Sequence, residues 1–173
     1  YTRIVTAFRA AYPEYRTQTE CILAAHFQLA PDCQAAADQL AAMVKQCGVQ
    51  LQTGFVGTPY ILHTLSDHGY AELAYSLLLR EEYPSWLYPV TKGATTIWEH
   101  WDGIMPDGNF WSADMNSYNH YAYGSVADWI YSVAAGIQRI PEFPGYEKVR
   151  IAPIPDSRLG WLSISLDTRY GTI

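Results

Sequence analysis

Acid–base and aromatic side chains crowd together in the run Trp98-Glu99-His100-Trp101-Asp102. A carboxylate flanked by two indoles suits sugar chemistry, because the C–H face of a pyranose packs on an aromatic plane while the acid handles a proton at the ring carbon. The run therefore makes Glu99 a candidate acid–base residue, with Trp98 and Trp101 as candidate walls of a sugar pocket. The same residues also fit a structural role, in which the tryptophans belong to the core and Glu99 caps a helix or forms a salt bridge.

The histidines differ in what their neighbours allow. His120 stands amid asparagines and tyrosines and is a candidate hydrogen-bonding group. His63 and His68 are five residues apart and His26 stands alone, so none of them forms the i, i+4 pair of metal ligands found on helices. The glycines of residues 54–57 lack the following lysine of a phosphate loop and are interpreted as turn residues. The sequence thus predicts neither a metal site nor a cofactor.

Charge and cysteine content exclude several classes of partner. Eleven basic residues stand against 17 acidic ones, and no three basic residues are consecutive, so nucleic acid and an anionic membrane surface are not expected as partners. No apolar run approaches the ~20 residues of a transmembrane helix. The three cysteines lack C-x-x-C spacing and are interpreted as buried free thiols, which favours a cytoplasmic compartment over a secreted one without deciding between them.

The first half of the chain has the apolar period of paired helices. Helices are predicted at residues 18–30, between Asp32 and Gly48, from Thr58 to Gly69, and at residues 70–83. Asp32 is the expected N-cap of the second helix, and Thr58, which precedes a proline, is the expected N-cap of the third.

The second half begins with a long interruption and ends in strand signals. Residues 84–116 are expected to form a loop of functional importance, apart from a short helix at residues 95–101. A further helix is predicted from residue 117 to Pro141. Alternating apolar residues predict strands around residues 149–151 and 162–166, followed by a hairpin turn at residues 168–171.

Four ordered runs of the sequence resemble the bacterial α-L-rhamnosidases. These runs are Thr53-Gly54-Phe55-Val56-Gly57-Thr58-Pro59-Tyr60, Pro84-Ser85-Trp86-Leu87-Tyr88-Pro89-Val90, Gly93-Ala94-Thr95-Thr96-Ile97-Trp98-Glu99-His100-Trp101-Asp102-Gly103 and Met115-Asn116-Ser117-Tyr118-Asn119-His120-Tyr121-Ala122-Tyr123-Gly124-Ser125-Val126. The resemblance covers nearly the whole chain. It implies a mainly α fold, in which residues 1–143 form the C-terminal half of an (α/α)₆ six-hairpin barrel. Residues 144–173 would then be the first strands of a β-sandwich domain.

The resemblance also implies an activity, the inverting hydrolysis of terminal α-L-rhamnose. Glu99 matches the general base that activates water, and His120 matches a residue that contacts the bound rhamnose. Trp98 and Trp101 are expected beside the sugar by position. The family's general acid is a glutamate from an earlier part of the barrel, and Glu14 and Glu20 lie in other sequence contexts. The expected partners are therefore a rhamnose-containing glycoside and the N-terminal half of the barrel.

Two other functions stay open at this point. The chain could be a non-catalytic sugar-binding or scaffold module that uses its tryptophans as a platform, or it could belong to a related α/α-barrel glycosidase that acts on another sugar. A half-barrel alone exposes apolar helix faces, so the isolated chain is expected to be inactive and prone to associate.

Overall fold

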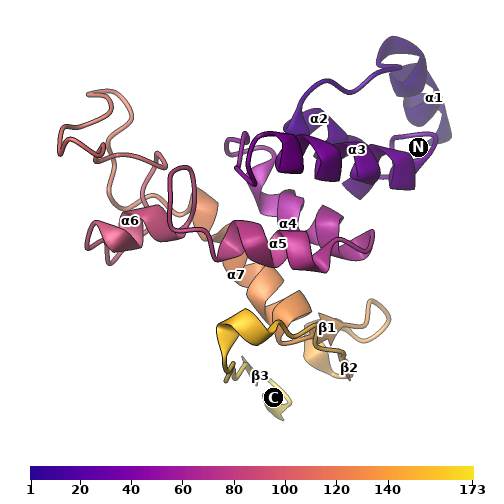
Figure 1. Cartoon of the computed structure of the whole chain (residues 1–173). Helices are drawn as coiled ribbons and strands as arrows, with labels where there is room; N and C mark the ends of the chain where they lie inside the picture. Colours follow the sequence, from indigo (N-terminus) through magenta and orange to yellow (C-terminus); the bar gives the residue numbers. More distant parts are fainter. The chain divides into compact units, whose positions relative to one another are not determined.

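The computed structural model describes all 173 residues as two compact units, Tyr1–Ser125 and Val126–Ile173. We call them the helical unit and the C-terminal unit (Figure 1). The helical unit contains α1 (Thr2–Ala11), α2 (Gln18–His26), α3 (Cys33–Gln46), α4 (Thr58–Asp67), α5 (Ala71–Leu78), α6 (Leu87–Thr91) and the 3₁₀ turn η1 (Ala122–Ser125). The C-terminal unit contains α7 (Val126–Trp129), η2 (Ile130–Ala134), β1 (Ile137–Arg139), η3 (Pro144–Tyr146), β2 (Val149–Ile151), η4 (Ser157–Leu159), β3 (Asp167–Thr168) and β4 (Gly171–Thr172).

The core of the helical unit lies between two helical hairpins. α2 packs on α3, α4 packs on α5, and α2 and α4 join the two pairs (Figure 1). Aliphatic side chains without any exposed surface fill the space between these helices, namely Ile22, Leu40, Val44, Ile61, Leu65 and Leu77. Alanines on α2 and α3 let these two helices approach closely. The predicted helical pairs are thus confirmed, and α1 is an additional helix that the sequence analysis does not predict.

The starts of two helices follow local sequence rules. Thr17 and Glu20 form a capping box at α2, in which each side chain accepts a hydrogen bond from the other residue's backbone N–H. Asp32 caps α3 as predicted, because its carboxylate accepts a hydrogen bond from Ala35 N at 2.9 Å.

The predicted N-cap of α4 is wrong by one residue. Gly57 is the N-cap, and Thr58 lies inside the first turn, where its buried hydroxyl forms a hydrogen bond of 2.8 Å with the hydroxyl of Thr53. A Cβ atom on Gly57 would lie 2.7 Å from the Thr19 hydroxyl on α2, so the close approach of two segments selects glycine here.

Several predicted helices end earlier than expected. α2 ends at His26 and α5 at Leu78, before the prolines that were expected to stop them. The helix predicted up to Pro141 ends at Ala134, after a 3₁₀ turn, one α turn and a π turn. The chain then turns at Gly136, which has a positive φ of 72°, and continues as β1.

The helix predicted at residues 95–101 is wrong, and this error matters for the site. Glu99 N donates to Ser117 O at 2.9 Å, and His120 N donates to Ile97 O at 2.8 Å. These bonds join residues 97–99 to residues 117–120 as neighbouring irregular segments, so the backbone groups that a helix would use internally are engaged elsewhere. Most of residues 84–116 form a loop as predicted, although α6 lies within them.

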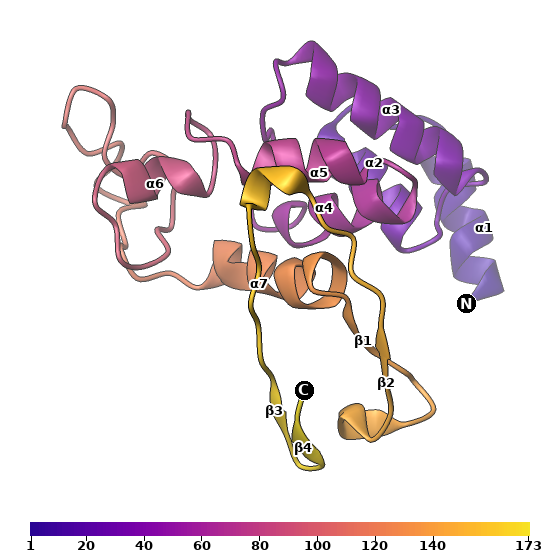
Figure 2. The ribbon, with the colours of Figure 1, turned by 60° about the horizontal axis from the view of Figure 1, so that its bottom comes forward.

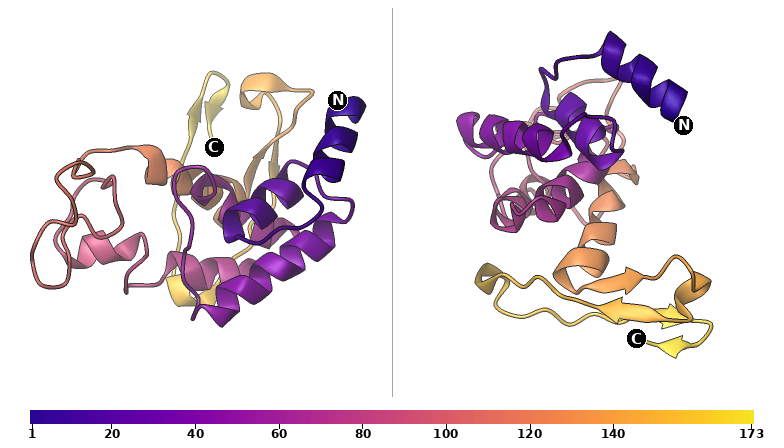
Figure 3. Two further views of the ribbon diagram at one scale, coloured as in Figure 1. Left: turned by 90° about the horizontal axis from the view of Figure 1, so that it is seen from above. Right: turned by 90° about the vertical axis from the view of Figure 1, so that its right-hand side faces the viewer.

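The C-terminal unit contains two small antiparallel sheets (Figures 2 and 3). β1 pairs with β2 in the register Ile137 to Ile151, and β3 pairs with β4 in a hairpin. The strand at residues 149–151 and the final hairpin are confirmed, whereas residues 162–166 do not form the predicted strand. A mainly helical chain ending in short strands agrees with the predicted fold class. The predicted domain boundary at residues 143 and 144 stays a prediction.

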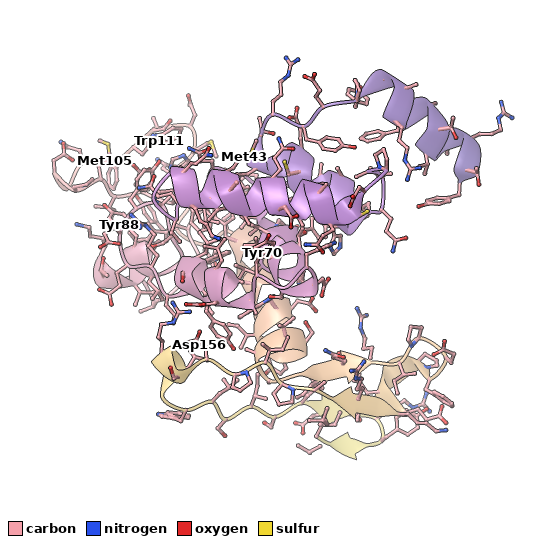
Figure 4. The ribbon with its side chains drawn as sticks, turned by 45° about the vertical axis from the view of Figure 1, so that its right-hand side comes forward. Met43, Tyr70, Tyr88, Met105, Trp111 and Asp156 are labelled. Carbon is pink, nitrogen blue, oxygen red and sulfur yellow. The ribbon has the colours of Figure 1, made fainter.

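The short 3₁₀ turn η4 is stabilised by the charged side chain of its N-cap residue, Asp156. The Asp156 carboxylate accepts hydrogen bonds from the backbone and the guanidinium of Arg158 at the start of η4 (Figure 4). These hydrogen bonds lower the pKa of Asp156 to about 2.

None of the helices in the chain is both long enough and apolar enough to cross a membrane.

Candidate active site

The two hydrogen-bonded segments fix Glu99 at both its backbone and its side chain. Its N–H donates to Ser117 O at 2.9 Å, and its Oε2 accepts a hydrogen bond from Ser117 N at 3.1 Å. The residue is half-buried, and Oε1 has no hydrogen-bond partner within the chain. The hydrogen bond to Oε2 therefore fixes the Glu99 side chain, and Oε1 is available to a water molecule or a ligand.

His120 lies on the partner segment and is fixed by three contacts. Its N–H donates to Ile97 O at 2.8 Å, its ring stacks on Phe55 with centroids 4.9 Å apart, and its Nδ1 accepts a hydrogen bond from Ala122 N at 3.4 Å. An accepting Nδ1 leaves Nε2 as the nitrogen that carries the proton. The ring lines a cavity of about 690 Å³, which Glu99 does not line.

Trp101 is buried rather than open to solvent. It is 6 % exposed, and it stacks on Tyr123 with centroids 3.8 Å apart and planes 8° apart. Trp86 packs edge-on against it and donates from Nε1 to Tyr123 O at 2.9 Å. Burial of this cluster raises the pKa of Tyr123 to about 12.

Trp98 is buried in the same way, with 5 % of its surface exposed. Its ring meets Tyr118 edge-on at 5.1 Å, and Tyr118 OH donates to Gly103 O at 2.9 Å. Trp98 and Trp101 thus form an aromatic support for the segment that carries Glu99. A direct contact of either indole with a sugar stays a prediction.

A second polar pair lies directly after Glu99. His100 Nδ1 and Asp102 Oδ1 are 2.6 Å apart, and the His100 ring stacks on Trp111 with centroids 3.7 Å apart. The Asp102 carboxylate is buried, and it adds to burial in raising the pKa of Tyr83 and of Tyr88. The contacts of His100 with Asp102 and Trp111 stabilise the bend that follows Glu99.

Sequence reasoning did not assign roles to Phe55 and Ser117. Both residues stand in runs that carried the family resemblance, but Phe55 is far from His120 along the chain and Ser117 acts mainly through its backbone. No pattern of side-chain spacing reveals a backbone N–H that holds a carboxylate. No group of three or more His, Cys, Asp and Glu side chains is arranged to hold a metal ion.

Comparison with known families identifies the helical part of the chain. A family model described as the bacterial alpha-L-rhamnosidase 6 hairpin glycosidase domain matches residues 2–134. The chain belongs to this family. A second model, the bacterial alpha-L-rhamnosidase C-terminal domain, matches residues 136–173. Together they confirm the predicted fold class, in which helices of a six-hairpin barrel are followed by strands of a C-terminal domain.

Curated relatives of this rhamnosidase-family chain are considerably longer than it. An alpha-L-rhamnosidase of Streptomyces avermitilis is 46 % identical over the whole chain, and one of Alteromonas sp. is 39 % identical over 91 % of it. The chain spans 17 % of the length of each relative.

Two solved structures are similar to this rhamnosidase-family chain. The alpha-L-rhamnosidase of Streptomyces avermitilis complexed with L-rhamnose has a TM-score of 0.89 and 42 % identity, covering 99 % of this chain and 17 % of that one. The Aspergillus terreus enzyme has a TM-score of 0.83 and 36 % identity, covering 89 % of this chain and 19 % of that one.

Proposed function

We propose that this chain supplies the base side of the active site of an inverting α-L-rhamnosidase. The observation that carries the proposal is the pairing of residues 97–99 with residues 117–120, which fixes Glu99 and His120 on two neighbouring segments. The named relatives support an α-L-rhamnoside as the substrate, because they are alpha-L-rhamnosidases and one structure is described as complexed with L-rhamnose.

Each side chain has a role that follows from its contacts. Glu99 Oε1 accepts a proton from water while Ser117 holds Oε2, and the water oxygen attacks the anomeric carbon. His120 donates from Nε2 to a sugar hydroxyl, since its Nδ1 accepts from Ala122. Trp98 and Trp101 pack on Tyr118 and Tyr123 and thereby stabilise the segment that carries Glu99.

Inversion requires a second carboxyl group about 6.5–9.5 Å from the base, which protonates the leaving oxygen. We assign this general acid to a part of the protein outside these 173 residues, because the chain spans 17 % of its curated relatives. The partner of the chain is thus the N-terminal part of the barrel, and we place the start of the following β domain at residue 144.

Hydrolysis of a panel of 4-nitrophenyl glycosides by the full-length protein that carries this chain tests the proposal. The α-L-rhamnoside should be cleaved much faster than the α-L-fucoside and the α-D-mannoside. Proton NMR should show β-L-rhamnose as the first product, because the attacking water enters opposite the α-linked leaving group. Preference for another sugar would favour the related glycosidase, and α-L-rhamnose as first product would contradict inversion.

The non-catalytic module is the weaker alternative on structural grounds. It requires tryptophans that offer an open platform, but of the four tryptophans in residues 84–116 only Trp111 is exposed. Saturable binding of L-rhamnose by the full-length protein without hydrolysis of any member of the panel would nevertheless support this alternative.

A further inference from the structure

The Thr96 hydroxyl joins the two segments of the candidate active site through a side chain. It donates a hydrogen bond to Tyr118 O. Tyr118 directly follows Ser117, whose backbone N–H holds Oε2 of Glu99 at 3.1 Å. Thr96 therefore anchors the backbone immediately beside the group that orients the proposed base.

The backbone hydrogen bonds between the two segments do not reach this carbonyl. Glu99 N donates to Ser117 O, and His120 N donates to Ile97 O, so Tyr118 lies between the two residues of its segment that these bonds engage. Tyr118 O accepts from the Thr96 hydroxyl and from no backbone N–H of the chain. Without that hydroxyl, water would take its place and this connection between the segments would be lost.

Threonine suits such a connection because its β-branched side chain has few χ1 rotamers, which keeps the hydroxyl directed at one partner. Thr96 is exposed, and it also borders the cavity that the His120 ring lines. Direct contact with the sugar is thus the competing role for this hydroxyl, and a test must separate the two.

We propose that Thr96 is a positioning residue, whose hydroxyl fixes Tyr118 and thereby the Ser117 N–H that directs Glu99 toward the attacking water. The inference rests on the proposed function, in which Glu99 is the general base. The His120 ring depends less on this connection, because it also stacks on Phe55. Loss of the hydroxyl should therefore act on kcat more than on KM, since misplacing a reacting group by about 1 Å costs up to ~10²-fold in rate.

The test measures kcat and KM on 4-nitrophenyl α-L-rhamnoside, using the full-length protein that carries this chain. Thr96→Val keeps the shape of the side chain without its hydroxyl, and it should lower kcat by about fivefold or more while KM changes less than about twofold. Thr96→Ser restores the hydroxyl and should recover most of the lost kcat. Thr96→Ala removes the same hydroxyl and replaces Thr96→Val if that variant does not fold.

Thr91→Val is the matched control. The Thr91 hydroxyl also donates to a backbone carbonyl, Tyr88 O at 2.7 Å, but this bond lies within α6 and joins neither segment of the site. Thr91→Val makes the same chemical change and should keep the wild-type kcat.

A double-mutant cycle shows whether Thr96 acts through Glu99. In a Glu99→Gln background the proton acceptor is already absent, so adding Thr96→Val should lower the residual kcat by less than about twofold. A role confined to general stability would repeat the full loss in that background, and this result would overturn the positioning role. A rise in KM with an unchanged kcat would also overturn it, because it would assign the hydroxyl to sugar contact.

The outcomes separate this inference from the proposed function. Wild-type kcat in Thr96→Val, together with a large loss in Glu99→Gln, would overturn the positioning role and leave the assignment of the base intact. Wild-type kcat in Glu99→Gln would overturn both.

Discussion

Single residues in this chain acquire their roles from backbone contacts. The sequence alone identifies Glu99 and His120 through their residue types and their neighbours. It cannot indicate that Ser117 N holds the Glu99 carboxylate, nor that Phe55 supports the His120 ring, because both contacts depend on how distant segments meet. The same reason explains Trp101, since its burial against Tyr123 follows from packing and not from its position beside Glu99.

The reactivity of the Cys21 thiol tests whether this residue is packed in the core of the helical unit. Cys21 has no exposed surface, and burial raises the pKa of its thiol to about 11. Because the thiolate is the reactive form, we expect iodoacetamide at pH 8 to modify native Cys21 at least tenfold more slowly than the half-buried Cys33. Peptide mass spectrometry measures both rates in one sample. Equal rates in the native protein would contradict the burial of Cys21, and denaturant should abolish the difference.

Elements of this chain are predictable where the sequence itself provides their ends. Asp32 starts α3 because its side chain satisfies a backbone N–H three residues later, which is a local rule. Residues 95–101 have the composition of a capped helix, yet they form an irregular segment whose backbone is hydrogen-bonded to Ser117 and His120. Tertiary contacts of this kind outweigh local helix propensity, which is why the two helical hairpins were predictable while the helix at residues 95–101 was not.

The turn into β1 provides a test at the scale of elements. Gly136 has a φ of 72°, and a Cβ atom there would lie 2.2 Å from the backbone of Ala152. We expect Gly136→Ala to lower the free energy of unfolding by at least ~3 kcal/mol, combining the left-handed conformation with a backbone overlap.

Gly160→Ala is the matched control for this turn. Gly160 has a φ of 71°, but a Cβ atom there would meet nothing within 4 Å, so this variant bears only the conformational cost of ~1–2 kcal/mol. Urea unfolding of both variants in the full-length protein measures the difference. Equal destabilisation by the two substitutions would show that the approach of Ala152 to Gly136 is absent.

At the scale of the whole molecule, the chain corresponds to a small part of its curated relatives. It spans 17 % of its curated relatives, and Ile4 on α1 and Tyr12 directly after it are exposed. An inverting site needs two carboxyl groups, and we assign only the base to this chain.

We therefore expect the 173 residues expressed alone to hydrolyse no aryl rhamnoside and to associate through exposed apolar surface. Light scattering after size-exclusion chromatography, with an activity assay on the same fractions, checks both expectations. A monomer with the turnover of the full-length protein would contradict the assignment of the general acid to another segment.

The most direct test of the central claim is the turnover of Glu99→Gln in the full-length protein that carries this chain. Glutamine keeps the size of the side chain but cannot take a proton from water, so kcat on 4-nitrophenyl α-L-rhamnoside should fall by at least ~10²–10³-fold. Glu81→Gln, an exposed carboxylate of the same unit, is the control and should keep wild-type turnover. Wild-type turnover in Glu99→Gln would contradict the role of Glu99 as the general base.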